Sequence, residues 1–316
     1  MPRPHHDRIN RRGFLECMGW AGSGALFTIS GGVATSLSLE AAIAAPVRRS
    51  AVKSFSFVQI SDTHIGFKKP ANPDTLGTLR ETIGKIKALP VQPDFVIHTG
   101  DVTHLATPEQ FDLAQAAMAE LTLPIHVIPG EHDMAGGTDP RPYLERFGKQ
   151  TQGDGWYSFD AGGVHFVGLV SVLHLGDKGQ GTLGADQLAW LGDDLRRLTP
   201  STPVVLLSHF PLWSLWPDWG WGTVDAAAAM AMLGRFGSVT VLNGHIHQVQ
   251  QHIEGNIVFH TARSTAYPQS PPGEGVGPGP LLVPPERLRD AIGLRTVQVR
   301  RSAGPLAVID MALAGG

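Results

Sequence analysis

Short apolar runs alternate with amphipathic stretches along most of the chain, a pattern that indicates layered strands and helices. Compact apolar runs predict strands, and Leu, Ile and Ala at helical spacing predict helices. Between two such runs, Ala161-Gly162-Gly163 predicts a hairpin turn whose glycines supply positive φ. The predicted strands are 56–61, 94–99, 125–129, 156–160, 164–170, 203–208, 238–242, 249–253, 257–261, 295–300 and 307–311, and the predicted helices are 76–89, 108–121, 183–198 and 225–236.

Two segments depart from this pattern. Residues 271–285 are dense in Pro and Gly and predict an irregular loop, which we interpret as a surface connection rather than a lid over a site. Residues 213–221 contain four tryptophans, at 213, 216, 219 and 221. Tryptophans in a loop either line a ligand pocket or fill the edge of a core, and the sequence leaves both interpretations open.

Residues 1–45 predict a targeting segment rather than part of the fold. An arginine pair at 11–12 precedes Phe14-Leu15, a mildly apolar stretch follows over 17–39, and Ala42-Ile43-Ala44 has the small residues of a cleavage site. This arrangement resembles a twin-arginine signal, which implies that the twin-arginine export machinery delivers folded protein to the periplasm. An uncleaved anchor is the alternative, but the Gly, Ser and Thr content makes a weak span, so no stable membrane span is expected after cleavage.

Composition limits the remaining chain, 46–316, to a few classes of protein. A sequence of 316 residues is long enough for one large α/β domain with a sizeable core. The net charge is −3 and no Lys/Arg block stands out, so no nucleic acid partner is expected. Cys17, the single cysteine, lies in the predicted signal. The mature protein is therefore expected to use neither disulfides nor thiolate chemistry.

Candidate chemistry lies just past the carboxyl ends of five predicted strands, where ligands bind in open α/β sheets. The donors are oxygen and imidazole without sulfur, which suits Mn, Fe, Zn or Co. Side chains two apart in extended backbone point the same way, so each Asp-x-His or His-x-His pair is expected to grip one ion. A preceding glycine allows a sharp turn close to the metal. The motifs are Asp62-Thr63-His64, Gly100-Asp101, Gly130-Glu131-His132-Asp133, Ser208-His209 and Gly244-His245-Ile246-His247.

The order of these motifs resembles that of the calcineurin-like metallophosphoesterase superfamily, from about Phe55 to His247. The resemblance implies an α/β fold, a four-layer αββα sandwich in which two central mixed sheets are flanked by helices. It also implies two divalent or mixed-valence transition metal ions, with Asp101 bridging them. By the same resemblance, Asp62, His64 and His247 hold the first ion, and Glu131, His209 and His245 hold the second.

The implied activity is hydrolysis of a small phosphate mono- or diester. Two metals a few ångströms apart hold a bridging hydroxide that attacks phosphorus, and they neutralise charge on the phosphate oxygens. His132 is left as a general acid that protonates the leaving oxygen. Asp133 is expected to orient that imidazole and raise its pKa, with a loop cap as its alternative role. His104 is expected beside the site, and His98, His126 and His165 are expected to be packed within strands.

Glu131 occupies a position where the family usually has Asn. We expect its carboxylate to coordinate the second ion, rather than to point away and leave a weak site. If it points away, the alternative function is a catalytically weak metal-binding or phospho-ligand-binding protein. Substrate selection is expected to lie in the loops 134–155, 213–222 and 268–286.

Overall fold

The computed structural model describes residues 25–30, 33–38, 53–275, 277–300 and 306–315. The chain divides into two units, Met1–Arg49 and Ser50–Gly316. In the first unit, β1 (Ala25–Ser30) pairs with β2 (Val33–Ser38) in antiparallel register. The arginine pair and the cleavage site expected near the N-terminus lie outside the described residues. Within the described ranges, no helix combines the length and the apolar content needed to cross a membrane.

The second unit contains two mixed sheets. The five-stranded sheet has the order β13-β12-β3-β4-β5, and the six-stranded sheet has the order β10-β11-β9-β8-β7-β6. In the six-stranded sheet β11, β9, β8 and β7 run parallel, and the edge strands β10 and β6 are antiparallel to their neighbours. In the five-stranded sheet β3, β4 and β5 run parallel, and β12 is antiparallel to both of its neighbours. The bounds are β3 (Phe55–Ile60), β4 (Phe95–Thr99), β5 (Ile125–Ile128), β6 (Tyr157–Ala161), β7 (Val164–Gly168), β8 (Val204–Ser208), β9 (Val239–Asn243), β10 (Gln250–Glu254), β11 (Ile257–Thr261), β12 (Gly293–Val299) and β13 (Ala307–Ala312).

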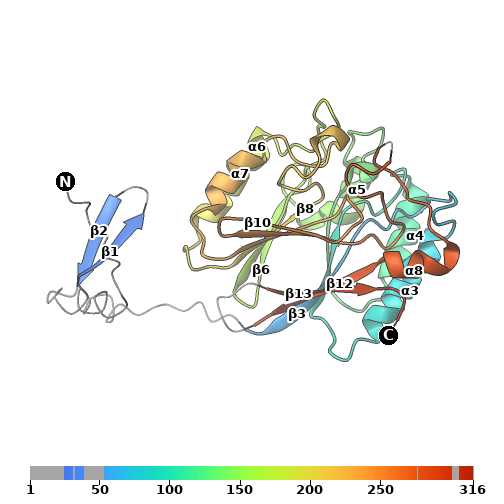
Figure 1. Ribbon diagram of the computed structural model, residues 1–316, viewed down its shortest axis with the longest axis horizontal. Coiled ribbons are helices and arrows are strands. Elements are labelled where there is room, and N and C mark those ends of the chain that lie inside the picture. The colour runs from blue at the N-terminus through green and yellow to red at the C-terminus, as the bar shows by residue number, and fades with distance from the viewer. Residues whose placement is uncertain (1–24, 31–32, 39–52, 276, 301–305, 316) are drawn as a thin grey trace, which may run out of the picture. The chain divides into compact units, whose positions relative to one another are not determined.

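Helices cover the outer faces of both sheets. Figure 1 shows α6 and α7 on one side of the sheet pair, and α3, α4 and α8 on the other. The α-helices of the described chain are α3 (Thr75–Lys87), α4 (Pro108–Met118), α5 (Arg141–Phe147), α6 (Ala185–Arg196), α7 (Ala226–Leu233) and α8 (Leu288–Ala291). The described chain also contains four short 3-10 helices, namely η1 (Glu131–Asp133), η2 (Gly148–Gln150), η3 (Pro217–Trp219) and η4 (Pro285–Arg287).

Three hydrophobic clusters fill the spaces between the four layers. Val58 of β3 packs with α3 and α4, while its neighbour Phe57 packs between the sheets against Phe166 of β7. Successive strand side chains point to opposite faces, so each central strand is buried on both sides and reads as a continuous apolar run. The third cluster joins α6 and α7 to the outer face of β8 and β9. The expected αββα sandwich with two mixed sheets is therefore confirmed.

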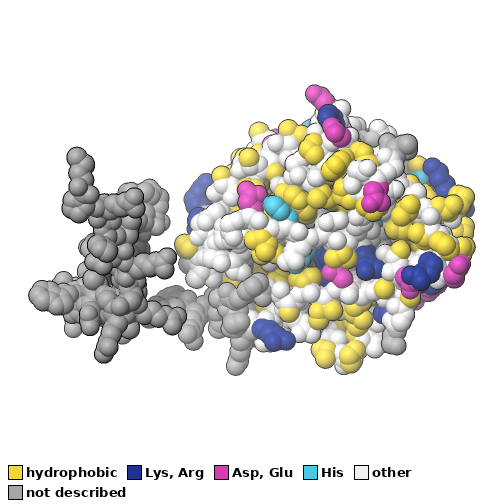
Figure 2. Space-filling model, in the orientation of Figure 1, with side chains coloured by type: hydrophobic (Ala, Val, Ile, Leu, Met, Phe, Trp, Pro, Cys, Tyr) yellow, Lys and Arg dark blue, Asp and Glu magenta, His cyan; other side chains and the backbone are white. Residues whose placement is uncertain are grey.

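The predicted strands and helices all occur, with ends displaced by a few residues. The hairpin turn also occurs, with positive φ at Gly162 and Gly163. Two short helices, α5 and α8, escape prediction because they are seven and four residues long and bury too few side chains to show a helical period. On the face drawn in Figure 2, hydrophobic side chains form several patches separated by polar and charged ones.

Candidate metal centre

All five predicted motifs lie at the carboxyl ends of strands. Asp62, Asp101 and Glu131 follow β3, β4 and β5 of the five-stranded sheet, whereas His209 and His245 follow β8 and β9 of the six-stranded sheet. Because these strands run parallel within each sheet, their carboxyl ends share an edge. The side chains of the two sheets meet there in one cluster.

One group of side chains in this cluster contains Asp62, His64 and His247. Nε2 of His247 lies 3.3 Å from Oδ1 of Asp62 and 3.2 Å from Nε2 of His64. Nδ1 of His247 donates to the carbonyl oxygen of Tyr267 at 2.7 Å, which leaves Nε2 as the nitrogen with a free lone pair. All three side chains are buried and close enough together to hold one ion.

A second group contains Glu131, His209 and His245. Oε2 of Glu131 lies 2.8 Å from Nε2 of His209, and its Oε1 lies 3.0 Å from Nδ1 of His245. Nδ1 of His209 donates to the carbonyl oxygen of Thr99 at 2.7 Å, so its Nε2 also presents a lone pair to the cluster. Glu131 therefore points into the group rather than away from it.

Asp101 lies between the two groups. Its Oδ2 is 3.4 Å from Nε2 of His64 in the first group and 3.5 Å from Nε2 of His209 in the second. Its other oxygen, Oδ1, accepts a hydrogen bond from the backbone N–H of His132 at 2.9 Å. One carboxylate oxygen is thus shared between both groups, while the other is fixed by the chain.

Several buried polar atoms in this cluster have no hydrogen-bond partner among the described residues: Oδ2 of Asp62, Oε2 of Glu131 and Nε2 of His209. Buried polar atoms usually find a partner, because losing water without replacing it costs free energy. Converging carboxylate oxygens and imidazole lone pairs without partners are what a pair of cations requires, so the residues fit two metal ions.

The backbone at this cluster is left-handed, which corrects the expectation of extended chain. φ is 53° at Asp62, 42° at His64, 54° at Asp101, 68° at His245 and 57° at His247. Each such L residue costs roughly 1–2 kcal/mol of backbone energy. The prediction that each pair holds one ion is therefore wrong for His-x-His. The side chains of His245 and His247 lie in different groups.

Glycines next to the ligand candidates allow the close approach predicted from the sequence. A Cβ on Gly130 would lie 2.1 Å from Oδ1 of Asp101. Gly100 has a φ of +94°, and a Cβ there would lie 2.5 Å from Nδ1 of His209. No other residue fits either position without moving a side chain of the cluster.

His132 lies beside the cluster, but Asp133 does not orient it. Nδ1 of His132 lies 2.8 Å from the carbonyl oxygen of His104, and the two rings stack. Both oxygens of Asp133 instead accept backbone N–H groups, from Val102 at 3.0 Å, Thr103 at 2.8 Å and Gly130 at 3.0 Å. The orienting role predicted for Asp133 is therefore wrong. This carboxylate satisfies backbone donors that would otherwise be buried without partners, as in its alternative role of loop cap.

The electrostatics of these two residues follow from burial and neighbouring charge. Burial works to lower the pKa of His132, but the carboxylates of Asp101 and Glu131 raise it above its ordinary value. Asp133 adds a smaller effect in the same direction, so its expected influence on this pKa is present although it does not orient the ring. Burial, together with the charge of Asp101, raises the pKa of Asp133 to about 6.

The cluster opens into a cavity of about 440 Å³. Tyr267 stacks over His64, with ring centroids 4.9 Å apart, and Phe210 lies 3.9 Å from the ring of His245. These two residues, together with Lys69 and Gln269, line the cavity without any motif that could have revealed them from the sequence.

Two loops also contribute to the cavity. Pro278, Gly279 and Pro280 line it, so the interpretation of 271–285 as a plain surface connection is wrong. The tryptophan-rich loop, residues 213–221, has both of the roles that its sequence left open, lining a pocket and filling the core. Trp219 lines the cavity, whereas Trp221 is fully buried in the protein.

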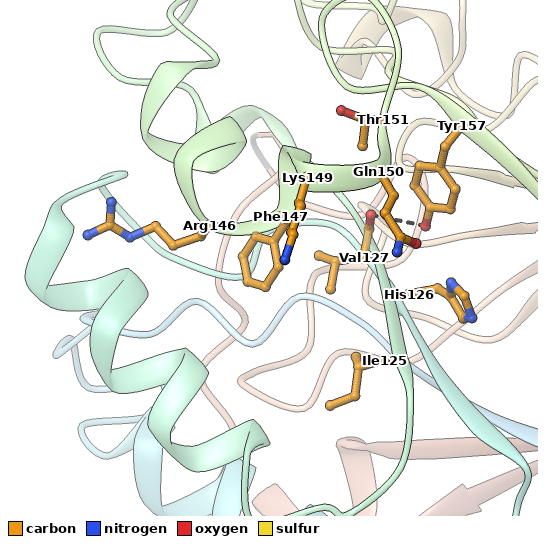
Figure 3. Close-up of a pocket in the computed structure, with 9 residues that line it drawn as sticks. All are labelled: Ile125, His126, Val127, Arg146, Phe147, Lys149, Gln150, Thr151 and Tyr157. Atoms are coloured by element: carbon orange, nitrogen blue, oxygen red, sulfur yellow. Dashed lines mark hydrogen bonds between the residues drawn. The ribbon is translucent and has the colours of Figure 1, made fainter.

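A separate hollow of about 220 Å³ lies beside β5 (Figure 3). Tyr157 directs its hydroxyl to the carbonyl oxygen of Val127 at 3.0 Å, and Arg146 is paired with Asp112 at 3.0 Å. No carboxylate lines this hollow, so it lacks the donors of a second metal cluster.

The histidines expected to be packed within strands are packed. His98 contacts the hydroxyl of Thr63 at 3.1 Å, and His126 stacks on Phe159 with centroids 3.7 Å apart. His165 lies between two carboxylates, 2.8 Å from Asp160 and 2.7 Å from Asp194. These three residues are held by structural contacts remote from, or behind, the cluster.

The chain is similar in sequence and in fold to known proteins. A sequence model of the calcineurin-like phosphoesterase family matches residues 55–249. A probable glycerophosphodiester phosphodiesterase of Arcobacter nitrofigilis is 28% identical over 229 residues, which cover 66% of this chain and 78% of that protein. A 3′,5′-cyclic-nucleotide phosphodiesterase of Nostoc sp. is 28% identical over 222 residues, which cover 67% and 79%. A purple acid phosphatase from yellow lupin has the same fold, with a TM-score of 0.63 and 13% identity over 84% of this chain and 53% of that one.

Proposed function

We propose that this chain, which belongs to the calcineurin-like phosphoesterase family, hydrolyses phosphate mono- or diesters with two metal ions bound at the cluster described above. Family membership makes it a metallophosphoesterase, a hydrolase of phosphoric ester bonds. The observation that supports the two-metal proposal is the position of Asp101. A single oxygen of this residue lies between two groups, each of which contains buried donor atoms without partners.

In this proposal Asp101 would be a ligand of both ions. Donors that are oxygen and imidazole only favour divalent or mixed-valence transition metals, such as Mn, Fe, Zn or Co. When bound, the metal pair supplies a water of lowered pKa and neutralises charge on the phosphate oxygens. The first ion would be held by Asp62, His64 and His247, and the second by Glu131, His209 and His245.

His132 supplies the proton for the leaving oxygen. Its Nδ1 is engaged by the carbonyl oxygen of His104, so Nε2 is the atom that carries the mobile proton. A histidine with Nε2 free beside the metal ligands has the atom that a general acid requires. Phosphate diesters with alkoxide leaving groups depend most on this step, because alkoxides are poor leaving groups without a proton.

The two relatives are both named as phosphodiesterases, which favours diesters as the first substrates to try. A catalytically weak metal-binding protein remains the competing proposal. It is disfavoured by the inward position of Glu131, with both of its oxygens at 3.0 Å or less from histidine nitrogens.

The test is a panel of phosphate monoesters and diesters assayed side by side on protein of defined metal content. We expect turnover that requires about two metals per chain and is absent from the chelated protein and from Asp101→Asn. Stoichiometric metal without turnover of any ester would instead support the weak metal-binding protein.

We further propose that the chain is exported to the periplasm by the twin-arginine machinery. The support is the sequence alone: Arg11 and Arg12 before Phe14, with a small-residue site at 42–44. Replacing both arginines with lysine should leave unprocessed precursor in the cytoplasm, while the unchanged chain is cleaved after about residue 44. Normal processing of the double variant would contradict this route.

A further inference from the structure

The cavity has two chemically different sides. Its floor consists of the carboxylates and imidazoles at the strand ends, while its outer wall comes from three loops. Leu175, Trp219, Pro278 and Pro280 form that wall, and none of them offers a hydrogen bond acceptor or a charge from its side chain. A phosphate group matches the floor, whereas these four wall side chains offer it no more than the indole N–H of Trp219.

The loops of the wall are fixed to one another rather than loosely placed. Lys178 of the first loop pairs with Asp218 of the second at 2.7 Å. Gly220 packs so closely on the first loop that a Cβ there would lie 2.4 Å from the carbonyl oxygen of Lys178. Gly273 of the third loop meets the ring of Trp216, where a Cβ would lie 3.0 Å away. The wall is therefore a preformed surface, as is usual for ligand sites.

Apolar character continues from the wall to the protein surface. Leu175 is 44% exposed, Trp216 is 37% exposed and Leu282 is 67% exposed. Of these three residues only Leu175 lines the cavity, whereas Trp216 and Leu282 lie on the loops that carry Trp219 and Pro280. The charge of Lys178, which also lines the cavity, is balanced by Asp218. Lys69 also lines the cavity, so the lining holds one further cationic side chain beside the apolar wall.

The size of the cavity fits the same conclusion. Ligand sites of roughly 300–1,000 Å³ hold whole small molecules and are lined mainly by apolar and aromatic side chains around a few polar ones. At about 440 Å³, this cavity holds a phosphate together with a sizeable organic group. Because the wall is continuous with the floor, that group would be attached to the phosphate itself.

We propose that the wall formed by Leu175, Trp219, Pro278 and Pro280 binds an apolar organic group esterified to the phosphate of the substrate. This inference rests on the proposed phosphoesterase function and narrows its substrate class. An alkyl chain and an aromatic ring are both apolar, so either would meet this requirement. Binding of either group would remove apolar surface of the ligand and of the wall from water.

The experiment measures binding of phosphonates, which cannot be hydrolysed at the carbon–phosphorus bond, to the metal-loaded protein by calorimetry. One arm is the alkyl series from methyl to octyl, below micelle-forming concentrations, and the other arm is phenyl- and naphthylphosphonate. We expect Kd to fall by up to about fourfold per added methylene until the wall is covered, or to fall comparably for the aromatic arm. A gain in one arm identifies the source of the apolar group. Kd values that stay the same along the alkyl series and from phenyl- to naphthylphosphonate would overturn the proposal.

Variants of the wall separate specific contact from general hydrophobic binding. Trp219→Gln should flatten the series, whereas Trp219→Leu, which stays apolar, should retain most of its slope. Leu175→Gln is a second variant at an exposed position that the fold should tolerate. Ile253→Gln is the matched control, because Ile253 is 61% exposed on β10 and does not line the cavity. If Ile253→Gln flattens the series as much as Trp219→Gln does, the wall is not the binding surface.

The same measurement is independent of catalysis. Protein that binds longer phosphonates more tightly but hydrolyses no ester would contradict the proposed function and retain the apolar subsite. Protein that hydrolyses esters at rates and affinities independent of their organic group would contradict the apolar subsite and retain the proposed function.

Discussion

Nδ1 of His132 lies 2.8 Å from the carbonyl oxygen of His104, and the two imidazole rings stack with centroids 4.8 Å apart. A carbonyl oxygen can only accept, so Nδ1 carries hydrogen and Nε2 is the nitrogen free to exchange a proton with substrate. The backbone N–H of His132 is fixed as well, by Oδ1 of Asp101. His132 is therefore held from two sides without being needed as a metal ligand.

His132→Ala should keep both metals and lose protonation of the leaving oxygen. We expect the rate to fall by about 10²–10⁴-fold for an alkyl ester, the usual contribution of a general acid. The fall should be much smaller for a nitrophenyl ester, whose leaving group needs little protonation. Rates for the two esters, with metal content from elemental analysis, provide the measurement. Asp101→Ala is the contrasting variant, because it removes the shared oxygen and should lose metal. Loss of metal from His132→Ala would show that the roles are divided differently.

Glu131→Asn should change which metals are bound. With Glu131, the cluster offers three carboxylates, which is one formal negative charge more than with Asn, and a more anionic donor set favours a trivalent ion such as Fe(III). The variant should therefore bind less iron relative to divalent metals. Metal content after reconstitution with defined Fe, Mn and Zn mixtures measures this preference. A variant that binds the same metals in the same ratio and turns over faster would remove the special role of Glu131.

Gly130→Ala should displace Asp101, because the added Cβ would lie 2.1 Å from its Oδ1. The expected result is weakened metal binding with the helices and sheets retained, measured by metal titration and circular dichroism. Gly84→Ala is the control, since a Cβ on this α3 residue meets nothing within 4 Å. That control should be stabilised by roughly 0.5–1 kcal/mol, the usual difference between Ala and Gly in a helix. Unchanged metal affinity in Gly130→Ala would contradict the close approach.

The buried pair of His165 and Asp194 should make stability depend on pH. Burial opposes the charge of His165, but the hydrogen bonds that its ring donates to Asp194 and Asp160 raise its pKa above the ordinary value. Its stabilisation is therefore fully present below pH 6.5 and is lost as pH rises through the folded-state pKa. Asp194 has a lowered pKa: burial opposes its charge, and His165 outweighs burial. Its stabilisation is present above pH 3.8 and is lost as pH falls through the folded-state value.

Both contributions are present together between about pH 4 and pH 6.5. His165→Gln should therefore lower the urea midpoint most near pH 5.5 and less near pH 9, since the histidine has then lost its charge in the unchanged chain as well. His174→Gln, at an exposed histidine, is the control and should change neither midpoint. An equal loss at both pH values would show that His165 acts by packing alone.

The fold and most of the cluster could be predicted from local sequence because they depend on short-range signals. Strands buried on both faces are continuous apolar runs, and polar residues after their ends stand out against them. The partner of Asp133 could not be predicted in this way. Its carboxylate accepts from Val102 and Thr103, some 30 residues away, and no local pattern records that a backbone N–H there lacks a partner.

The positions of loop residues were the other feature that could not be predicted from the sequence. Pro278 and Pro280 look like solvent-facing chain because Pro and Gly exclude regular structure, yet tertiary contacts bring them to the cavity. The tryptophans at 219 and 221 are two residues apart, and one lines the cavity while the other is buried in the core. In an irregular turn no period links sequence spacing to direction, so only the packed structure distinguishes them.

The cluster draws Asp62, Asp101 and Glu131 from the five-stranded sheet, and His209 and His247 from the six-stranded sheet. A metal pair gripped by both sheets would act as a cross-link across the seam of the sandwich. Each tenfold excess of free metal over its Kd then adds about 1.4 kcal/mol to the free energy of unfolding, so melting temperature becomes a measure of metal supply. Chelation would consequently do more than stop turnover: it would loosen one half of the sandwich from the other.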